Sequence, residues 1–327
     1  MTIRLYASTD SSAPTLSGTA GDMINLLDKI LVAGYGSQTA AGWTKPYTTT
    51  NVAVFQQGSG SNGYVMRVDD TGATVTGGAR DALVRGAESA SAHSTVVDPF
   101  PLTSQVADTI CAWRKSSTAD ATTRVWRAVA DATFILLWVN FGSNLGDLYF
   151  FGDVPELYTG DSYNTMIWQR NDSVAGNGSS SLACATTGAY SSTFVQTKHW
   201  VRSRDGTIKS VTGQVHHSGT SIGNLPSGCH TYPSTNVSSK LLLRKVLASE
   251  SYSTTTTTGT GGHYRGVIPC YFDALVATST SLAHLDTFSD SNYNSNFLIL
   301  IGDGNAGFAP GAARTHTFQT SGTFDAS

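Results

Sequence analysis

Charge is scarce in this sequence of 327 residues. Only 13% of the residues are Asp, Glu, Lys or Arg, which is about half of the quarter that is usual for soluble proteins. The formal net charge is −3, and the densest basic groups are Arg244-Lys245 and the spaced pair Arg202 and Arg204. Proteins that bind nucleic acids usually carry a clustered basic face. We therefore expect no binding of DNA or RNA.

Long apolar runs are also missing. The longest, residues 134–139, has the length of a strand, whereas a helix that crosses a membrane needs roughly 18–20 apolar residues. The first residues lack the basic segment followed by an apolar segment that marks a signal peptide. We therefore expect a soluble protein that is made in a cytoplasm and has no membrane partner.

Cysteine is rare and scattered. The four cysteines are Cys111, Cys184, Cys229 and Cys270, and no two of them form a C-x-x-C pair. In a cytoplasmic protein of this size we expect free and mostly buried thiols. A disulfide between Cys184 and Cys229 stays open, because spacing alone does not decide whether two cysteines meet.

Recognisable nucleotide-binding and zinc motifs are absent as well. The sequence contains no phosphate-binding P-loop and no H-E-x-x-H zinc helix. His216-His217 and Cys229-His230 are adjacent pairs, whereas zinc ligands are usually spaced by roughly two to four residues. Asp69-Asp70-Thr71-Gly72 resembles part of a calcium loop but lacks the other ligands, so we interpret it as a turn. We expect no metal, no cofactor and no enzymatic activity.

Ser, Thr, Gly and Asn replace the missing charge, and these residues favour strands and turns. Segments of strand length recur at a spacing of roughly 10–15 residues, with turn residues between them. This pattern predicts a mainly β protein with a β-sandwich or jelly-roll-like body. The segments 51–55 and 64–68 are expected to form a hairpin around the glycine-rich turn at 58–63, and the segments 123–130 and 133–141 are expected to be adjacent strands around a tight turn near Asp131. The predicted strands include residues 51–55, 64–68, 82–87, 109–114, 123–130, 133–141, 148–151, 162–169, 194–202, 208–215, 241–247, 267–276 and 297–301.

One short amphipathic helix is predicted over about residues 20–33. Thr19 or Ser17 is placed to cap its first turn, Asp22 favours the start of a helix, and Gly34 is placed to end it. We expect the apolar face to cover a sheet, with docking on a neighbouring subunit as the alternative. The apolar residues at helical spacing are Met23, Leu26, Leu27, Ile30 and Leu31.

The middle of the chain contains a break in this pattern. Residues 171–192 are rich in turn-forming residues and poor in apolar ones. We interpret them as a loop or linker between an N-terminal β domain (1–170) and a C-terminal β region with an extended tail (193–327). The alternative is an inserted loop within one continuous domain.

Acidic and aromatic residues gather between residues 149 and 168. A glycosidase needs two carboxylates roughly 5–9 Å apart, and no motif fixes such a separation here. We therefore favour turn formation for the acidic residues, with contact to a glycan as the alternative. The candidate glycan contacts are Asp153, Glu156, Tyr158, Asp161 and Trp168.

Short segments with a distinctive order extend over nearly the whole chain. They include RLYASTD at residues 4–10, GWTKPY at 42–47, RDALVRG at 80–86 and AHLDTFS at 283–289. In this order they resemble a family of uncharacterised structural proteins from the virions of tailed bacteriophages. Residues 171–270 depart most from that family, which supplies no catalytic residues to carry over.

The resemblance implies a non-enzymatic virion subunit, assembled in the bacterial cytoplasm, that contacts other virion proteins and copies of itself. We expect a place in the tail assembly, at the tail tip, baseplate or fibre. A capsid decoration or cement protein is the first alternative, and a receptor module that binds a host surface glycan is the second. The N-terminal segment and the tail from Gly302 are the expected docking arms. Their candidate residues are Thr2, Ile3, Leu5, Tyr6, Pro14, Phe308, Phe318 and Phe324.

Overall fold

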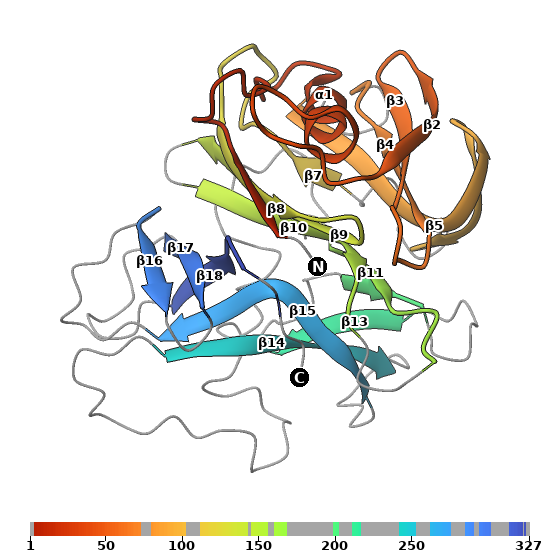
Figure 1. The fold of residues 1–327 in the computed structure, drawn as a ribbon. Helices are drawn as coiled ribbons and strands as arrows, with labels where there is room; N and C mark the ends of the chain where they lie inside the picture. Colours follow the sequence, from red (N-terminus) through yellow and green to blue (C-terminus); the bar gives the residue numbers. More distant parts are fainter. Residues whose placement is uncertain are drawn as a thin grey trace.

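The structure is a computed structural model, and it shows a mainly β protein with a sandwich-like body, as predicted (Figure 1). The described residues form two antiparallel sheets and one short α-helix that continues as a π-helix. The described residues are 3–72, 80–102, 112–142, 145–155, 160–168, 199–202, 211–216, 242–252, 262–275, 285–290, 294–301, 314–322 and 324.

The smaller sheet belongs to the first part of the chain, and its strands follow the order β2-β3-β4-β5-β6, with β7 paired to β5. The predicted hairpin over residues 51–55 and 64–68 is confirmed, because β3 and β4 pair in antiparallel register with Val54 opposite Arg67. The strand bounds are Thr44–Thr49 (β2), Val52–Gln56 (β3), Val65–Asp69 (β4), Asp81–Ala92 (β5), Thr95–Phe100 (β6) and Ala112–Arg114 (β7).

The larger sheet has twelve strands in the order β1-β8-β9-β10-β11-β12-β13-β14-β15-β18-β17-β16. Most neighbours in this sheet are also consecutive along the chain, so simple hairpins build it. The bounds are Arg4–Ala7 (β1), Val125–Ala130 (β8), Phe134–Gly142 (β9), Leu145–Asp153 (β10), Thr165–Trp168 (β11), His199–Val201 (β12), Val211–His216 (β13), Leu242–Tyr252 (β14), Gly262–Leu275 (β15), Thr287–Asp290 (β16), Ser295–Ile301 (β17) and Arg314–Gln319 (β18).

The sharp turn between β8 and β9 is made by a single aspartate. Asp131 Oδ1 accepts hydrogen bonds from the backbone N–H groups of Thr133 (2.7 Å) and Phe134 (3.2 Å). Such a side chain replaces the backbone acceptor of a turn. The predicted pairing of these two strands around Asp131 is confirmed by their register.

The predicted helix is confirmed as α1 (Asp22–Asp28), followed by the π-helical η1 (Lys29–Ala33). Gly34 ends it with a positive φ of 75°, as expected. The predicted cap was wrong: Gly21 is the N-cap residue and no side chain caps the helix locally. Instead, Asp70 from the end of β4 accepts the backbone N–H of Met23 at 2.8 Å.

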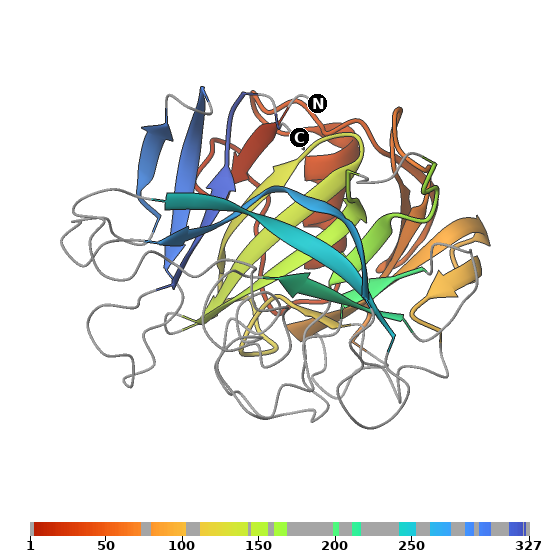
Figure 2. The same cartoon turned by 90° about the horizontal axis from the view of Figure 1, so that it is seen from below.

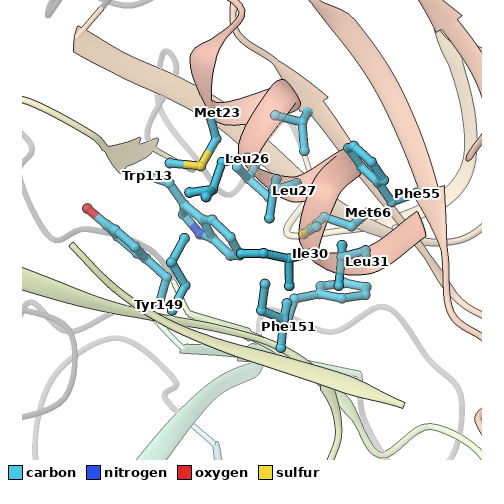
Figure 3. Packing of buried hydrophobic residues seen from close by; sticks show 14 of the residues in the cluster. Met23, Leu26, Leu27, Ile30, Leu31, Phe55, Met66, Trp113, Tyr149 and Phe151 are labelled. Atoms are coloured by element: carbon cyan, nitrogen blue, oxygen red, sulfur yellow. The ribbon is translucent and has the colours of Figure 1, made fainter. Parts of the chain in front are cut away.

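The apolar face of the helix lies between the two sheets (Figure 3). Leu27 and Leu31 are fully buried, and they share a core cluster with Phe55 of the small sheet and Phe151 of the large one. The helix therefore fills the space between the sheets, which confirms that its apolar face covers a sheet of its own chain.

A second core lies on the opposite face of strands β8–β11. The body therefore has three layers: the small sheet with the helix, the strands β8–β11, and the part of the large sheet that contains β15, β17 and β18. Along β9, Ile135 and Leu137 belong to the core with the helix, whereas Phe134 and Leu136 pack toward β15 and β18. Figures 1 and 2 show β14 and β15 crossing this far face. Burial on both faces explains why β9 is a continuous apolar run in the sequence.

Both halves of the sequence contribute to one sheet. Strand β11, before residues 171–192, pairs with β12 after them, with Ile167 opposite Trp200. Residues 171–192 themselves lie outside the described residues. The proposed boundary between residues 1–170 and 193–327 therefore falls between two hydrogen-bonded strands of the same sheet.

Candidate functional site

The aromatic candidate for glycan contact is part of the core. Trp168 is fully buried, and its ring lies 5.2 Å from that of Phe150 and 5.7 Å from that of Tyr271, measured between centroids. Its Nε1–H donates to the sulfur of Met166 at 3.1 Å. A sugar cannot stack on a ring that is covered by its own chain, so Trp168 is not a glycan platform in this structure.

Asp153, at the end of β10, is a buried structural centre. Its Oδ1 accepts hydrogen bonds from Gln57 Nε2 (3.0 Å) and Thr165 Oγ1 (2.6 Å), and its Oδ2 accepts the backbone N–H of Asn62 (2.7 Å). Burial raises the pKa of Asp153, although these hydrogen bonds oppose the shift. The carboxylate thus fastens the turn after β3 to the large sheet.

Asp161, the next carboxylate, is also buried and is paired with Arg265 of β15. The guanidinium donates to both carboxylate oxygens at 2.7 and 2.9 Å, and to the backbone oxygen of Tyr163 at 2.8 Å. Glu156 and Tyr158 lie outside the described residues. The described members of the acidic group therefore hold strands together and do not present two free carboxylates to a substrate.

The N-terminal docking candidates lie in the core of their own chain. Ile3, Tyr6 and Pro14 are buried and Leu5 is half-buried, while β1 pairs with β8 over its whole length. Tyr6 also donates its hydroxyl to the backbone oxygen of Thr39 at 2.8 Å. Leu5 and Tyr6 belong to β1, an edge strand of the large sheet; Ile3 packs in the chain's own core just before it, and Pro14 lies buried in the loop that follows. The remaining candidate, residue 2, lies outside the described residues.

The C-terminal docking candidates are placed in a similar way. Phe318 is fully buried on β18, which is paired on one side with β15 and on the other with β17. Phe324 is buried against Phe272, with 6.2 Å between ring centroids, and Phe308 lies outside the described residues. The described part of the tail thus completes the sheet instead of extending away from it.

The most distinctive polar cluster was not predicted from the sequence. Asp70 follows β4 and Lys115 follows β7, and both side chains have an exposed fraction of 0%. Lys115 Nζ contacts Asp70 Oδ1 and also donates to the backbone oxygen of Thr19 at 2.5 Å. Asp70 Oδ2 accepts the backbone N–H of Met23. The cluster therefore joins the ends of two strands to the start of the helix.

The sequence contained only an indirect signal for this cluster. The segment from Asp69 to Gly72 was interpreted as a turn, and the structure confirms that turn: Asp69 Oδ1 accepts the hydroxyl of Thr71 at 2.7 Å, and Gly72 has a φ of 73°. A turn needs only one of the two aspartates. The turn therefore does not account for the second aspartate, Asp70, and nothing in the spacing of the sequence indicates that it contacts Lys115.

Within the part of the chain that the structure describes, no three His, Cys, Asp or Glu side chains gather as a metal site. Among the same residues, no helix has the length and apolarity to cross a membrane. Cys270 is a free, buried thiol, and its pKa is raised well above the usual value by burial; the other three cysteines lie outside the described residues.

No protein-family model matches this chain, and no curated protein matches it.

Proposed function

We propose that this protein is a non-enzymatic structural subunit of a tailed-phage virion, most closely suited to the tail assembly, and that it works through contacts among many copies and with other virion proteins. The observation that carries the proposal is the distribution of charge. Only 13% of the residues are charged, and among the described residues several of these charges lie in buried ion pairs.

Four basic side chains in the described residues are buried: Arg114, Lys115, Arg202 and Arg265. Each of them is paired with a carboxylate, as Arg114 is with Asp81 at 2.8 Å. Lysine and arginine are almost never fully buried in ordinary proteins unless they are paired. These four basic groups are therefore not available for contacts at the surface of the part of the chain that the structure describes.

Neutral surfaces suit permanent assembly. Contacts between hydroxyl and amide groups lose little to salt screening, whereas exposed ion pairs weaken as the ionic strength rises. One edge strand of each sheet exposes hydroxyl groups: β2 exposes Thr44, Thr48 and Thr49, and β16 exposes Thr287 and Ser289. An edge strand also offers unpaired backbone groups to a neighbouring chain.

Quantitative mass spectrometry of purified particles, after separation of heads and tails, tests the proposal. We expect the protein in the tail fraction at several to dozens of copies per particle. Hundreds of copies in the head fraction would identify a capsid decoration protein instead. Absence from washed particles of a phage that encodes the protein would overturn the virion assignment as a whole.

A further inference from the structure

The cluster of Lys115 and Asp70 brings an amine and a carboxyl group together in a dry site. Both side chains have an exposed fraction of 0%, and Lys115 Nζ is in contact with Asp70 Oδ1. The two residues are 45 positions apart in the sequence and are delivered by the ends of β7 and β4. Because the fold already holds the two groups together, they do not need to diffuse together to react. Such positioning can lower the activation free energy of a reaction substantially.

The electrostatics of the site shift both groups toward their uncharged forms. Burial raises the pKa of Asp70 to about 6, although the charge of Lys115 opposes the shift. Burial also lowers the pKa of Lys115, against the attraction of Asp70. Both directions increase the share of a neutral amine beside a protonated carboxyl, because a low-dielectric interior disfavours charge. A neutral amine is a nucleophile, and a protonated carboxyl can release water.

We propose that Lys115 and Asp70 become joined by an intramolecular isopeptide bond. The lone pair of Lys115 Nζ attacks Asp70 Cγ, and a C–N bond forms. The C–O bond to one carboxyl oxygen then breaks, and this oxygen leaves as water with one proton from the carboxyl group and one from the amine. The product is a neutral secondary amide, and the step needs no oxidant, reductant or other reactant.

Two backbone groups are placed to assist this reaction. The N–H of Met23 donates to Asp70 Oδ2 at 2.8 Å, where negative charge develops when the carbon becomes tetrahedral, and a fixed donor at that place stabilises the transition state. The carbonyl of Thr19 accepts a hydrogen from Lys115 Nζ at 2.5 Å, which orients the amine. Full burial of both side chains keeps bulk water from the product.

The reaction also removes an energetic cost. Two charges in the interior carry a desolvation penalty that their mutual attraction only partly repays, whereas an amide is neutral. Two other ion pairs lack either the burial or the nucleophilic amine that this reaction requires. Lys45 and Asp28 are the same residue types in contact, but their side chains are 27% and 21% exposed. Arg114 and Asp81 are buried, but a guanidinium stays protonated and is not a nucleophile.

Tryptic digestion of the denatured full chain, followed by mass spectrometry, tests the proposal. A joined protein yields a branched peptide in which residues 68–80 are linked to residues 115–124, with the summed mass of the two peptides less one water. Fragmentation assigns the link to Asp70 and excludes the adjacent Asp69. In the same digest, residues 5–29 and 30–67, which carry Asp28 and Lys45, are expected to stay separate, as the exposed control pair.

Two variants complete the design. Lys115→Arg keeps the positive charge and is expected to abolish the branched peptide. Asp70→Asn is expected to yield the same branched peptide, because an amide can release ammonia where the carboxyl group releases water. Cleavage of the wild-type chain after Lys115, with residues 68–80 recovered as a linear peptide, overturns the proposal whatever the variants do. It would leave the proposed virion role untouched.

Discussion

At the scale of single residues, buried charges connect segments that are far apart in the sequence. Arg265 donates to Asp161, to the backbone oxygen of Tyr163 and to that of Arg202. A planar guanidinium has five donors in a fixed arrangement, so one side chain can satisfy several acceptors that come from different strands. It thereby holds β15 against the segment before β11 and the residue after β12.

Replacement of Arg265 by Ala is expected to reduce the free energy of unfolding by roughly 3–5 kcal/mol, because the carboxylate of Asp161 stays buried without its partner. Urea denaturation of the purified variant measures the effect. The matched control is Lys45→Ala, which breaks a partly exposed pair with Asp28 and is expected to cost roughly 0–1 kcal/mol. Equal losses in the two variants would contradict this account.

The protonation of Tyr6 gives the fold a sensitivity to alkaline pH. Burial raises the pKa of Tyr6 to about 12 from 10.0, so the folded state keeps a proton that the unfolded chain releases earlier. Its contribution to stability is present below pH 10 and is lost as the pH rises toward 12. We expect the free energy of unfolding to fall between pH 10 and 12, and to fall less in Tyr6→Phe. If the variant lost as much stability over this pH range as the wild-type protein, Tyr6 would not be the source of the pH dependence.

At the scale of secondary structure elements, one glycine permits the close approach of β10 to the turn before β9. Gly152 has a φ of 152°, and a Cβ at this position would lie 2.3 Å from Phe134 Cβ and 2.6 Å from the backbone oxygen of Thr133. Neither atom belongs to the flexible end of a side chain. Any larger residue would therefore force the two strands apart.

Gly152→Ala is accordingly expected to lower the free energy of unfolding by roughly 2–5 kcal/mol, through overpacking and an unfavourable φ together. Gly60→Ala is the control, since Gly60 also has a positive φ, of 84°, but nothing lies within 4 Å of its added Cβ. That variant is expected to lose only about 1 kcal/mol. Thermal or urea unfolding compares them, and similar losses would show that the close contact is unimportant.

The sequence predicted elements whose signal is local. The helix followed from its apolar spacing, the β3–β4 hairpin from alternation around a glycine-rich turn, and the β8–β9 turn from Asp131. Strand β18 was missed because its residues are mostly polar, although Thr317 is fully buried. The helix cap was missed because its acceptor, Asp70, lies 47 residues from Met23. Contacts of this kind are decided by the tertiary fold, which periodicity does not report.

The candidate sites show the same limit. The sequence grouped acidic and aromatic residues near Trp168, and in the structure Asp153 and Trp168 of that group are buried. Whether an aromatic side chain on a strand faces solvent or a second layer depends on what packs against that strand. In this protein β15 covers it from the other half of the chain.

At the scale of the whole molecule, the large sheet makes the two halves of the chain depend on each other. The far face of β9 to β11 is covered by β15, β17 and β18, in a core that includes Trp138, Phe150 and Tyr271. Without the second half, this apolar face would be exposed to water, and exposed patches of that kind lead to association.

A fragment of residues 1–170 is therefore expected to aggregate or to bind a hydrophobic dye strongly, whereas the full chain remains monodisperse or forms defined oligomers. Size-exclusion chromatography with light scattering, together with dye fluorescence, distinguishes the two. A soluble, folded fragment with weak dye binding would indicate that residues 1–170 are an independent domain after all.

The position of β18 has a consequence for synthesis. This strand follows β16 and β17 in the sequence, yet it lies between β15 and β17 inside the sheet. A ribosome adds roughly 5–20 residues per second, so the N-terminal layers are made many seconds before the strand that completes the last one. Premature termination or proteolysis before residue 314 would remove an interior strand of the large sheet, and β16 and β17 would lose their hydrogen-bonded connection to β15.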